Sequence, residues 1–138
     1  MGKLIKPLNY GYENMTDTNG TFSTYYGSVN SAKVRQYGKN VFIQFHLSDM
    51  NLQIGQSAGT YIGTISGVEL PTVPSHASGD YVIGMAILAE EEPETLGEGM
   101  LHQLPVVVTE NGDIMLVSEL SDSSYTAMFA RGNISYIV

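Results

Sequence analysis

Residues 34–47 read VRQYGKNVFIQFHL, and this stretch decides the fold. Apolar residues recur at every second position from Val41 to Leu47, with polar residues between them except at Phe42. Such alternation predicts a β-strand with one strongly buried face. The strand follows Gly38-Lys39-Asn40, in which glycine and asparagine tolerate the positive φ values of a tight turn. We therefore expect an antiparallel hairpin over residues 32–47.

The composition extends this prediction to the whole chain. Its 138 residues are enough for one domain with a core that needs no cross-links. Fifteen glycines and nine tyrosines, with many Ser, Thr and Val, are typical of strands and turns. No window has apolar residues at helical spacing over three turns. We expect an all-β protein of roughly seven to nine strands, a β-sandwich of the jelly-roll type.

The charge and the cysteine count exclude several classes of function. Fourteen acidic and six basic residues give a net charge of −8, which argues against binding to nucleic acid or to an anionic membrane. The absence of cysteine excludes disulfides and cysteine-based metal sites. The first ten residues, MGKLIKPLNY, lack the apolar segment of a signal peptide, and no apolar run is long enough to insert into a membrane.

Further strands follow the central hairpin. Thr60–Ile65 is a short strand candidate, and the prolines of Gly67–Ser78 predict an extended segment that crosses one end of the sheets. Asp80–Ala89 is apolar on both faces, which predicts burial in the sandwich core or against another subunit. Only 14% of the residues are charged, which also favours covered surface and oligomerisation.

Three dipeptides predict turns. Asn111-Gly112 favours a type I′ hairpin between Met100–Thr109 and Asp113–Val117. Arg131-Gly132 separates two predicted strands, Tyr125–Ala130 and Asn133–Val138. Asn19-Gly20 either closes a small peripheral hairpin or lies in an extended arm, so we divide the chain into an arm over residues 1–27 and a head over residues 28–138.

No group of residues predicts catalysis. His46, His76 and His102 are far apart in the chain and lack metal-ligand spacing, and no nucleophile elbow or phosphate loop occurs. The glutamates of residues 90–98 lie among Pro and Gly, which favours a solvated loop over a cation site, and a cation site over a catalytic carboxylate pair. We expect no enzymatic activity, no catalytic residue, no metal and no cofactor.

Tyrosines near the ends of strands are candidates for binding a ligand. Tyr combines an apolar ring with a hydroxyl, as saccharide recognition requires, and a neighbouring carboxylate accepts sugar hydroxyls. Alternatively, tyrosine simply suits half-buried strands. His46 alternates to the non-core side of its strand, which predicts a polar surface or interface residue. The predicted ligand-binding residues are Tyr61, His76, Asp80, Tyr81, His102 and Tyr125.

The order of these hairpins resembles that of bacteriophage tail-fibre and receptor-binding-protein head domains. The likeness covers residues 28–74 and 104–138, whereas residues 1–27 and the acidic loop match nothing in that group, and the chain lacks the Trp that such heads often carry. The matching pieces are the Gly-turned hairpin of residues 34–43, the Leu-Pro segment of residues 65–74, the hairpin of residues 106–114 and the closing strand of residues 132–137.

The resemblance implies a homotrimeric jelly-roll head at the tip of a phage or prophage tail. Its partners would be a host cell-surface saccharide, bound at loops or between subunits, and other tail or baseplate proteins. The resemblance assigns no contact residue. A structural connector that binds only proteins is the first alternative, and a polysaccharide-degrading enzyme is the second.

Overall fold

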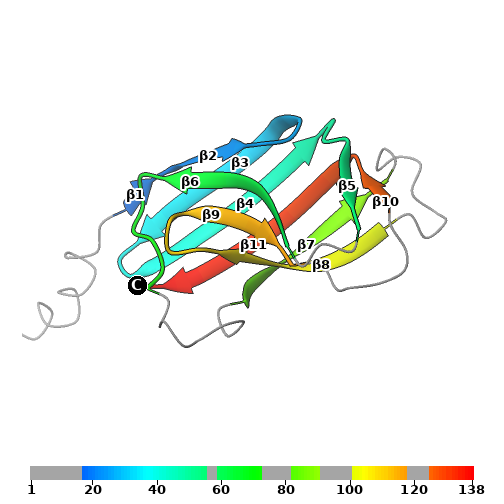
Figure 1. Cartoon of the computed structure of the whole chain (residues 1–138). Helices are drawn as coiled ribbons and strands as arrows, with labels where there is room; N and C mark the ends of the chain where they lie inside the picture. The colour runs from blue at the N-terminus through cyan, green and yellow to red at the C-terminus, as the bar shows by residue number, and fades with distance from the viewer. Residues whose placement is uncertain (1–16, 56–58, 73–81, 91–100, 118–124) are drawn as a thin grey trace, which may run out of the picture.

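The chain folds into β-strands, which confirms the predicted all-β class (Figure 1). The computed structural model describes residues 17–55, 59–72, 82–90, 101–117 and 125–138. In this part of the chain, no helix is long and apolar enough to span a membrane. The strands are β1 (Asp17–Asn19), β2 (Thr21–Thr24), β3 (Ser28–Tyr37), β4 (Asn40–Ser48), β5 (Leu52–Ile54), β6 (Thr60–Ser66), β7 (Val82–Ala89), β8 (Leu101–Val108), β9 (Asp113–Leu116), β10 (Tyr125–Ala127) and β11 (Phe129–Ile137).

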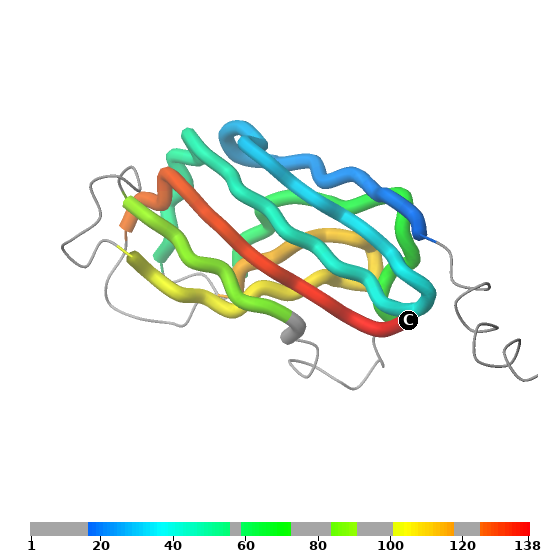
Figure 2. Tube along the Cα trace, turned by 180° about the vertical axis from the view of Figure 1, so that it is seen from behind, coloured from blue at the N-terminus to red at the C-terminus, as the bar shows by residue number. Residues whose placement is uncertain are grey.

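Nine strands form one antiparallel sheet that curls round the core until it is nearly closed. Their order is β1-β3-β4-β11-β7-β8-β9-β6-β2, and β5 and β10 form a separate pair at one end. One layer contains β3, β4, β11 and β7, which Figure 2 shows from outside, and β9 and β6 lie in the layer behind. The meander β7-β8-β9 with β6 beside β9 is a Greek key.

Gly20 is the corner at which the sheet closes. β1 pairs with β3, whereas β2, which begins one residue after Gly20, pairs with β6 at the other edge. The amide of Gly20 donates a hydrogen bond to the carbonyl of Val34 at 2.8 Å, and a Cβ at Gly20 would lie 2.4 Å from the Ser66 carbonyl oxygen. Asn19-Gly20 therefore does not close the predicted hairpin, and residues 17–24 of the predicted arm are strands of this sheet.

The central hairpin forms as predicted and is longer than expected. β3 and β4 pair from Ser28↔Ser48 to Tyr37↔Asn40, which leaves a two-residue turn at Gly38-Lys39. Gly38 has a φ of 63°, as the first central residue of a type II′ turn requires. The alternation buries one face of β4, at Val41, Ile43, Phe45 and Leu47.

Two glycines face the aromatic rings that join the layers. Phe22 of β2 and Phe45 of β4 stack with ring centroids 5.2 Å apart. A Cβ at Gly132 would lie 2.2 Å from the Phe45 ring, and a Cβ at Gly63 would lie 2.9 Å from that of Phe22. Each ring thus occupies the space above a glycine, which keeps the core dense across both layers.

The turn predicted at Arg131-Gly132 is wrong. β11 runs through both residues as one strand and pairs with β4 on one side and with β7 on the other. Glycine occurs there because the Phe45 ring takes the place of its side chain. The apolar C-terminal strand is therefore central in the sheet, with β4 along residues 130–137 of one edge and β7 along residues 129–134 of the other.

The Asn111-Gly112 hairpin exists, but its turn is not type I′. Only Gly112 has a positive φ, of 86°, and its amide donates to the carbonyl of Thr109 at 3.0 Å. This pattern is a type I turn over Glu110-Asn111 with Gly112 in the bulge position. The Thr109 hydroxyl accepts hydrogen bonds from the amides of Asn111 and Asp113, which favours this geometry over the two-residue turn.

The extended segment after β6 crosses one end of the barrel, as predicted, over its described residues 67–72. The Glu69 amide donates to the side chain of Gln36 at 2.8 Å, and Gln36 donates back to the Glu69 carboxylate at 2.6 Å. The hydroxyl of Tyr136 donates to the Glu69 carbonyl at 2.5 Å. Burial, and then the nearby Glu69 charge, raise the pKa of Tyr136 to about 12. This end clamp, formed by Gln36, Glu69 and Tyr136, ties the two layers together.

Candidate binding site on the outer face

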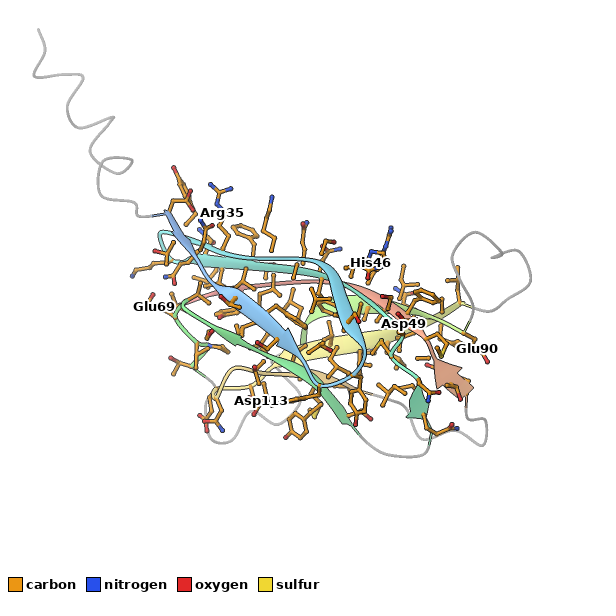
Figure 3. All side chains as sticks on the ribbon, turned by 90° about the horizontal axis from the view of Figure 1, so that it is seen from above. Arg35, His46, Asp49, Glu69, Glu90 and Asp113 are labelled. Atoms are coloured by element: carbon orange, nitrogen blue, oxygen red, sulfur yellow. The ribbon has the colours of Figure 1, made fainter. Side chains whose placement is uncertain are left out.

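The outer face of β3, β4 and β11 carries polar side chains in register. Residues opposite one another in a sheet share a face, so the pairings define rows across the strands. In Figure 3, the labelled His46 and Arg35 both project from this side of the barrel. One row contains Lys33, Gln44, Asn133 and Met85, and the next contains Ser31, His46, Arg131 and Ile87.

Two open hollows lie on this face, on either side of Gln44 and Asn133. The large hollow has a volume of about 420 Å³, and its floor includes Ala32 and Gly132. The small hollow has a volume of about 180 Å³ and is bounded by Phe42, which is half-exposed. We call the two hollows together the outer site. The polar side chains around the large hollow are those of Ser31, Lys33, Gln44, His46, Arg131 and Asn133.

The outer site is positively charged although the chain as a whole is acidic. Lys33 and Arg131 border the large hollow, and no acidic residue lines either hollow. Arg35 lies on the same face but forms a bidentate ion pair with Asp17, which lowers the pKa of that carboxyl chiefly through the hydrogen bond. Burial, and then the positive charge of Arg131, lower the pKa of His46. Lys33 and Arg131 therefore remain as the cations of the hollow.

Several polar side chains of the outer site have no hydrogen-bond partner in the part of the chain that the structure describes. In the residues that the structure describes, the side chains of Gln44, Asn133 and Arg131 make no hydrogen bond to other side chains or to the backbone. β4 and β11 are central strands whose backbone groups are used in pairing on both sides. A ligand on this face would therefore be held by side chains, not by the addition of a strand.

An apolar stripe borders the outer site on the side of β7. Met85 and Ile87 lie beside Asn133 and Arg131 and are 44% and 50% exposed. Leu101, at the start of β8, is 50% exposed on the same face. We predicted that both faces of β7 are buried. Within this chain the inner face, with Ala86 and Leu88, is buried, whereas Met85 and Ile87 on the outer face are exposed.

The predicted site residues His102 and Tyr125 come together, at the end of the barrel that carries β5 and β10. Their rings stack with centroids 3.6 Å apart and an interplanar angle of 6°. His102 Nε2 lies 2.8 Å from the carboxylate of Glu90, which Figure 3 labels at that end. Burial, and then the Glu90 charge, raise the pKa of Tyr125, whose hydroxyl has no hydrogen-bond partner among the described residues.

The other predicted site residues do not join this cluster. Tyr61 is half-exposed on β6 and pairs with Met115 of β9, and both lie in the layer opposite to the outer site. His76, Asp80 and Tyr81 lie outside the described residues, as do the glutamates of residues 91–98. Across the described ranges, no three His, Asp or Glu side chains form a group that would hold a metal ion.

Sequence reasoning missed the outer site for an identifiable reason. The alternation of β4 predicts His46 on the non-core side, and the structure confirms this, with His46 partly exposed. The sequence, however, predicts a turn at Arg131 and a new strand from Asn133, which gives no reason to align either residue with Gln44. Polar and apolar residues alternate from Arg131 to Ile137 as they do from Val41 to Leu47. Pairing these two segments as neighbouring strands would have placed Arg131 and Asn133 on the same face as Gln44.

Comparisons with known proteins add little to this geometry. No protein-family model matches the chain, and no curated protein matches it. One similar solved structure is that of the C-terminal receptor-binding domain of the avian reovirus fibre sigmaC. The alignment has 10% sequence identity and a TM-score of 0.43, and it covers 91% of this chain and 74% of that one.

Proposed function

We propose that this chain is a non-enzymatic binding domain whose outer site holds a cell-surface saccharide. The observation that carries the proposal is the pair of hollows around Gln44 and Asn133. Each carboxamide offers both donors and an acceptor, which suits the hydroxyl groups of a sugar because a hydroxyl also donates and accepts. Phe42 adds an exposed aromatic face at the small hollow, on which the C–H face of a sugar ring packs.

The resemblance of the hairpins to phage tail-fibre heads supports a more specific version of the proposal. In that version the domain stands at the tip of a phage or prophage tail, contacts other tail proteins and mediates host adhesion. Its sites would be individually weak, and repetition in a homotrimer would raise the overall affinity through effective concentration. The apolar stripe of Met85, Ile87 and Leu101 supports self-association, because it places exposed apolar area beside the outer site.

The saccharide proposal is tested by a glycan array. Wild type is compared with the double variant Gln44→Ala/Asn133→Ala, which removes both carboxamides. The matched control is Ser23→Ala/Thr64→Ala, which removes two facing polar side chains from β2 and β6 in the opposite layer. We expect wild type and control to bind the same glycans and the carboxamide variant to lose them. Equal binding by all three proteins would place the site elsewhere.

The assembly is tested separately by light scattering on the purified chain. A trimer has three times the 15.0 kDa mass of one chain, and Ile87→Glu within the stripe should dissociate it. A monomer at all concentrations would remove the multivalent part of the proposal. If the array shows no ligand while the trimer persists, the alternative of a connector that binds only proteins is favoured.

A further inference from the structure

The large hollow differs from a neutral sugar site in having cations on two of its sides. Lys33 stands on β3 and Arg131 on β11, with β4 between them. Neighbouring strands are about 4.8 Å apart, so the backbones that carry these residues are separated by about 10 Å. Both side chains are long enough to reach a group bound over β4, where Gln44 and His46 lie.

These cations are not neutralised by the residues that line the hollow. Arg35, the next cation on this face, is paired with Asp17, but none of the residues that line the large hollow is acidic. His46 lies opposite Arg131 on the neighbouring strand, and burial, followed by the Arg131 charge, lowers the pKa of His46. A carboxylate bound in the hollow would accept charge-assisted hydrogen bonds from Arg131.

We infer that the large hollow binds the carboxylate of an acidic sugar, a uronic or sialic acid, with Arg131 and Lys33 as its cationic contacts. This inference rests on the proposed saccharide-binding function and names the class of sugar. Gln44 and Asn133 hold the ring hydroxyls, and Phe42 contacts the neighbouring residue of the glycan. A volume of about 420 Å³ lies within the usual range for small-ligand sites.

An acidic peptide is the competing ligand, and the geometry disfavours it. Extended peptides bind sheets by pairing with an edge strand. The hollow instead lies over β4 and β11, which are paired on both sides and have no free backbone groups to offer. A compact carboxylated sugar ring contacts the side chains of the hollow and does not need hydrogen bonds to the backbone of β4 or β11.

The test uses matched ligands that differ in charge and hardly in shape. Trigalacturonate is compared with its methyl ester, and sialyllactose with the methyl ester of its sialic acid, by titration calorimetry on the full chain. We expect the carboxylated member of at least one pair to bind about tenfold more tightly or better, because only that member accepts charge-assisted hydrogen bonds from Arg131. The preference should shrink as salt is raised from about 0.05 to about 0.5 M.

Three variants locate the charge that selects the ligand. Arg131→Gln should remove most of the preference for the carboxylated sugar, and Lys33→Gln part of it. Lys39→Gln is the control, because Lys39 is an exposed cation in the β3–β4 turn and lines neither hollow. Thermal unfolding of each variant verifies that the fold is retained.

The outcomes separate this inference from the proposed function. If neutral and carboxylated partners bind equally and Gln44→Ala weakens both, charge selection is overturned and saccharide binding stands. If an array shows that the chain binds no sugar, the proposed function fails as well. If hexaglutamate binds at the hollow and no carboxylated sugar does, the inference is overturned in favour of an acidic peptide.

Discussion

On the outer face of β3, β4 and β11, amides, cations and a histidine lie between the buried positions, together with serines and the aromatic ring of Phe42. The outer face of β6 and β9 instead presents Tyr61, Met115 and Asp113. Figure 3 shows His46 and Asp113 on opposite sides of the barrel. On the second face, Asp113 accepts a hydrogen bond from the hydroxyl of Tyr25 at 3.4 Å, and burial followed by the Asp113 charge raises the pKa of Tyr25.

Both layers alternate buried apolar side chains with outward-facing ones, but the outward-facing side chains differ between the two layers in charge and polarity. The inner faces of both layers are apolar and are joined by the Phe22–Phe45 stack. Stability therefore depends mainly on the side chains that the two layers share. Binding depends on the outward positions, which packing does not constrain, and the β3–β4–β11 face combines hollows, amides and cations in one place.

The largest expected effect is on the core beneath the outer site. Gly132→Val places a branched side chain where the Phe45 ring lies, and even its Cβ would be 2.2 Å from that ring. We expect the free energy of unfolding to fall by about 3 kcal/mol, as overpacking of a dense core implies. Urea denaturation measures the change, and Ser135→Val on the exposed face of the same strand is the control. An unchanged midpoint for Gly132→Val would contradict this account of the stack.

The next effect distinguishes the two faces by their charges. Arg131→Ala should weaken binding of a carboxylated sugar by roughly 10- to 100-fold, because it removes a charge-assisted contact of about 1.5–3 kcal/mol. Asp113→Ala, on the opposite face, should change the same dissociation constant by less than about twofold, because the long-range repulsion between Asp113 and the ligand carboxylate is screened by salt. Titration calorimetry on both variants checks this. A gain for Asp113→Ala as large as the loss for Arg131→Ala would mean that the net charge, and not the outer site, governs binding.

A smaller effect concerns the end clamp that joins the two layers. Tyr136→Phe removes the hydrogen bond to the Glu69 carbonyl and should reduce the free energy of unfolding by about 1 kcal/mol. The folded pKa of Tyr136 is about 12, above its usual value of 10.0. A raised pKa means that the folded state favours the protonated phenol. The contribution of the protonated Tyr136 to the free energy of unfolding is complete below pH 10 and is lost as the pH rises toward 12 and beyond.

Denaturant titrations at neutral pH and at alkaline pH measure this loss. The wild-type chain should lose stability more steeply above pH 10 than Tyr136→Phe, which has no phenol at this position. Parallel curves for the two proteins would show that ionisation of Tyr136 does not destabilise the clamp.

The smallest effect is expected at Tyr61. Its ring is half-exposed on the second face, so Tyr61→Ala should alter the free energy of unfolding by no more than about 0.5 kcal/mol. Sugar binding should be unchanged in calorimetry. A loss of binding would transfer the saccharide site to the tyrosine-bearing face that the sequence first indicated.

The sequence predicted local structure better than it predicted the site. Residues 34–47 encode their own hairpin, because alternation and a glycine turn act over a few residues. The local sequence around Gly132 does not explain why glycine occurs there. The explanation is the ring of Phe45, which fills the space of a side chain at Gly132 but lies far away in the chain. The stacking of His102 on Tyr125 joined two predicted site residues. Their separation in the chain gave no indication of contact, just as nothing in the sequence aligned Arg131 with His46.

Backbone amide NMR determines whether a bound glycan contacts the outer site or another part of the chain. The chain is titrated with the glycan that it binds most tightly on the array, and the shifted amides are assigned. We predict that the largest shifts fall on β4 and β11 around Gln44 and Asn133, with small shifts around Tyr61. Shifts centred on Tyr61, or on the Glu90–His102–Tyr125 cluster, would contradict the account.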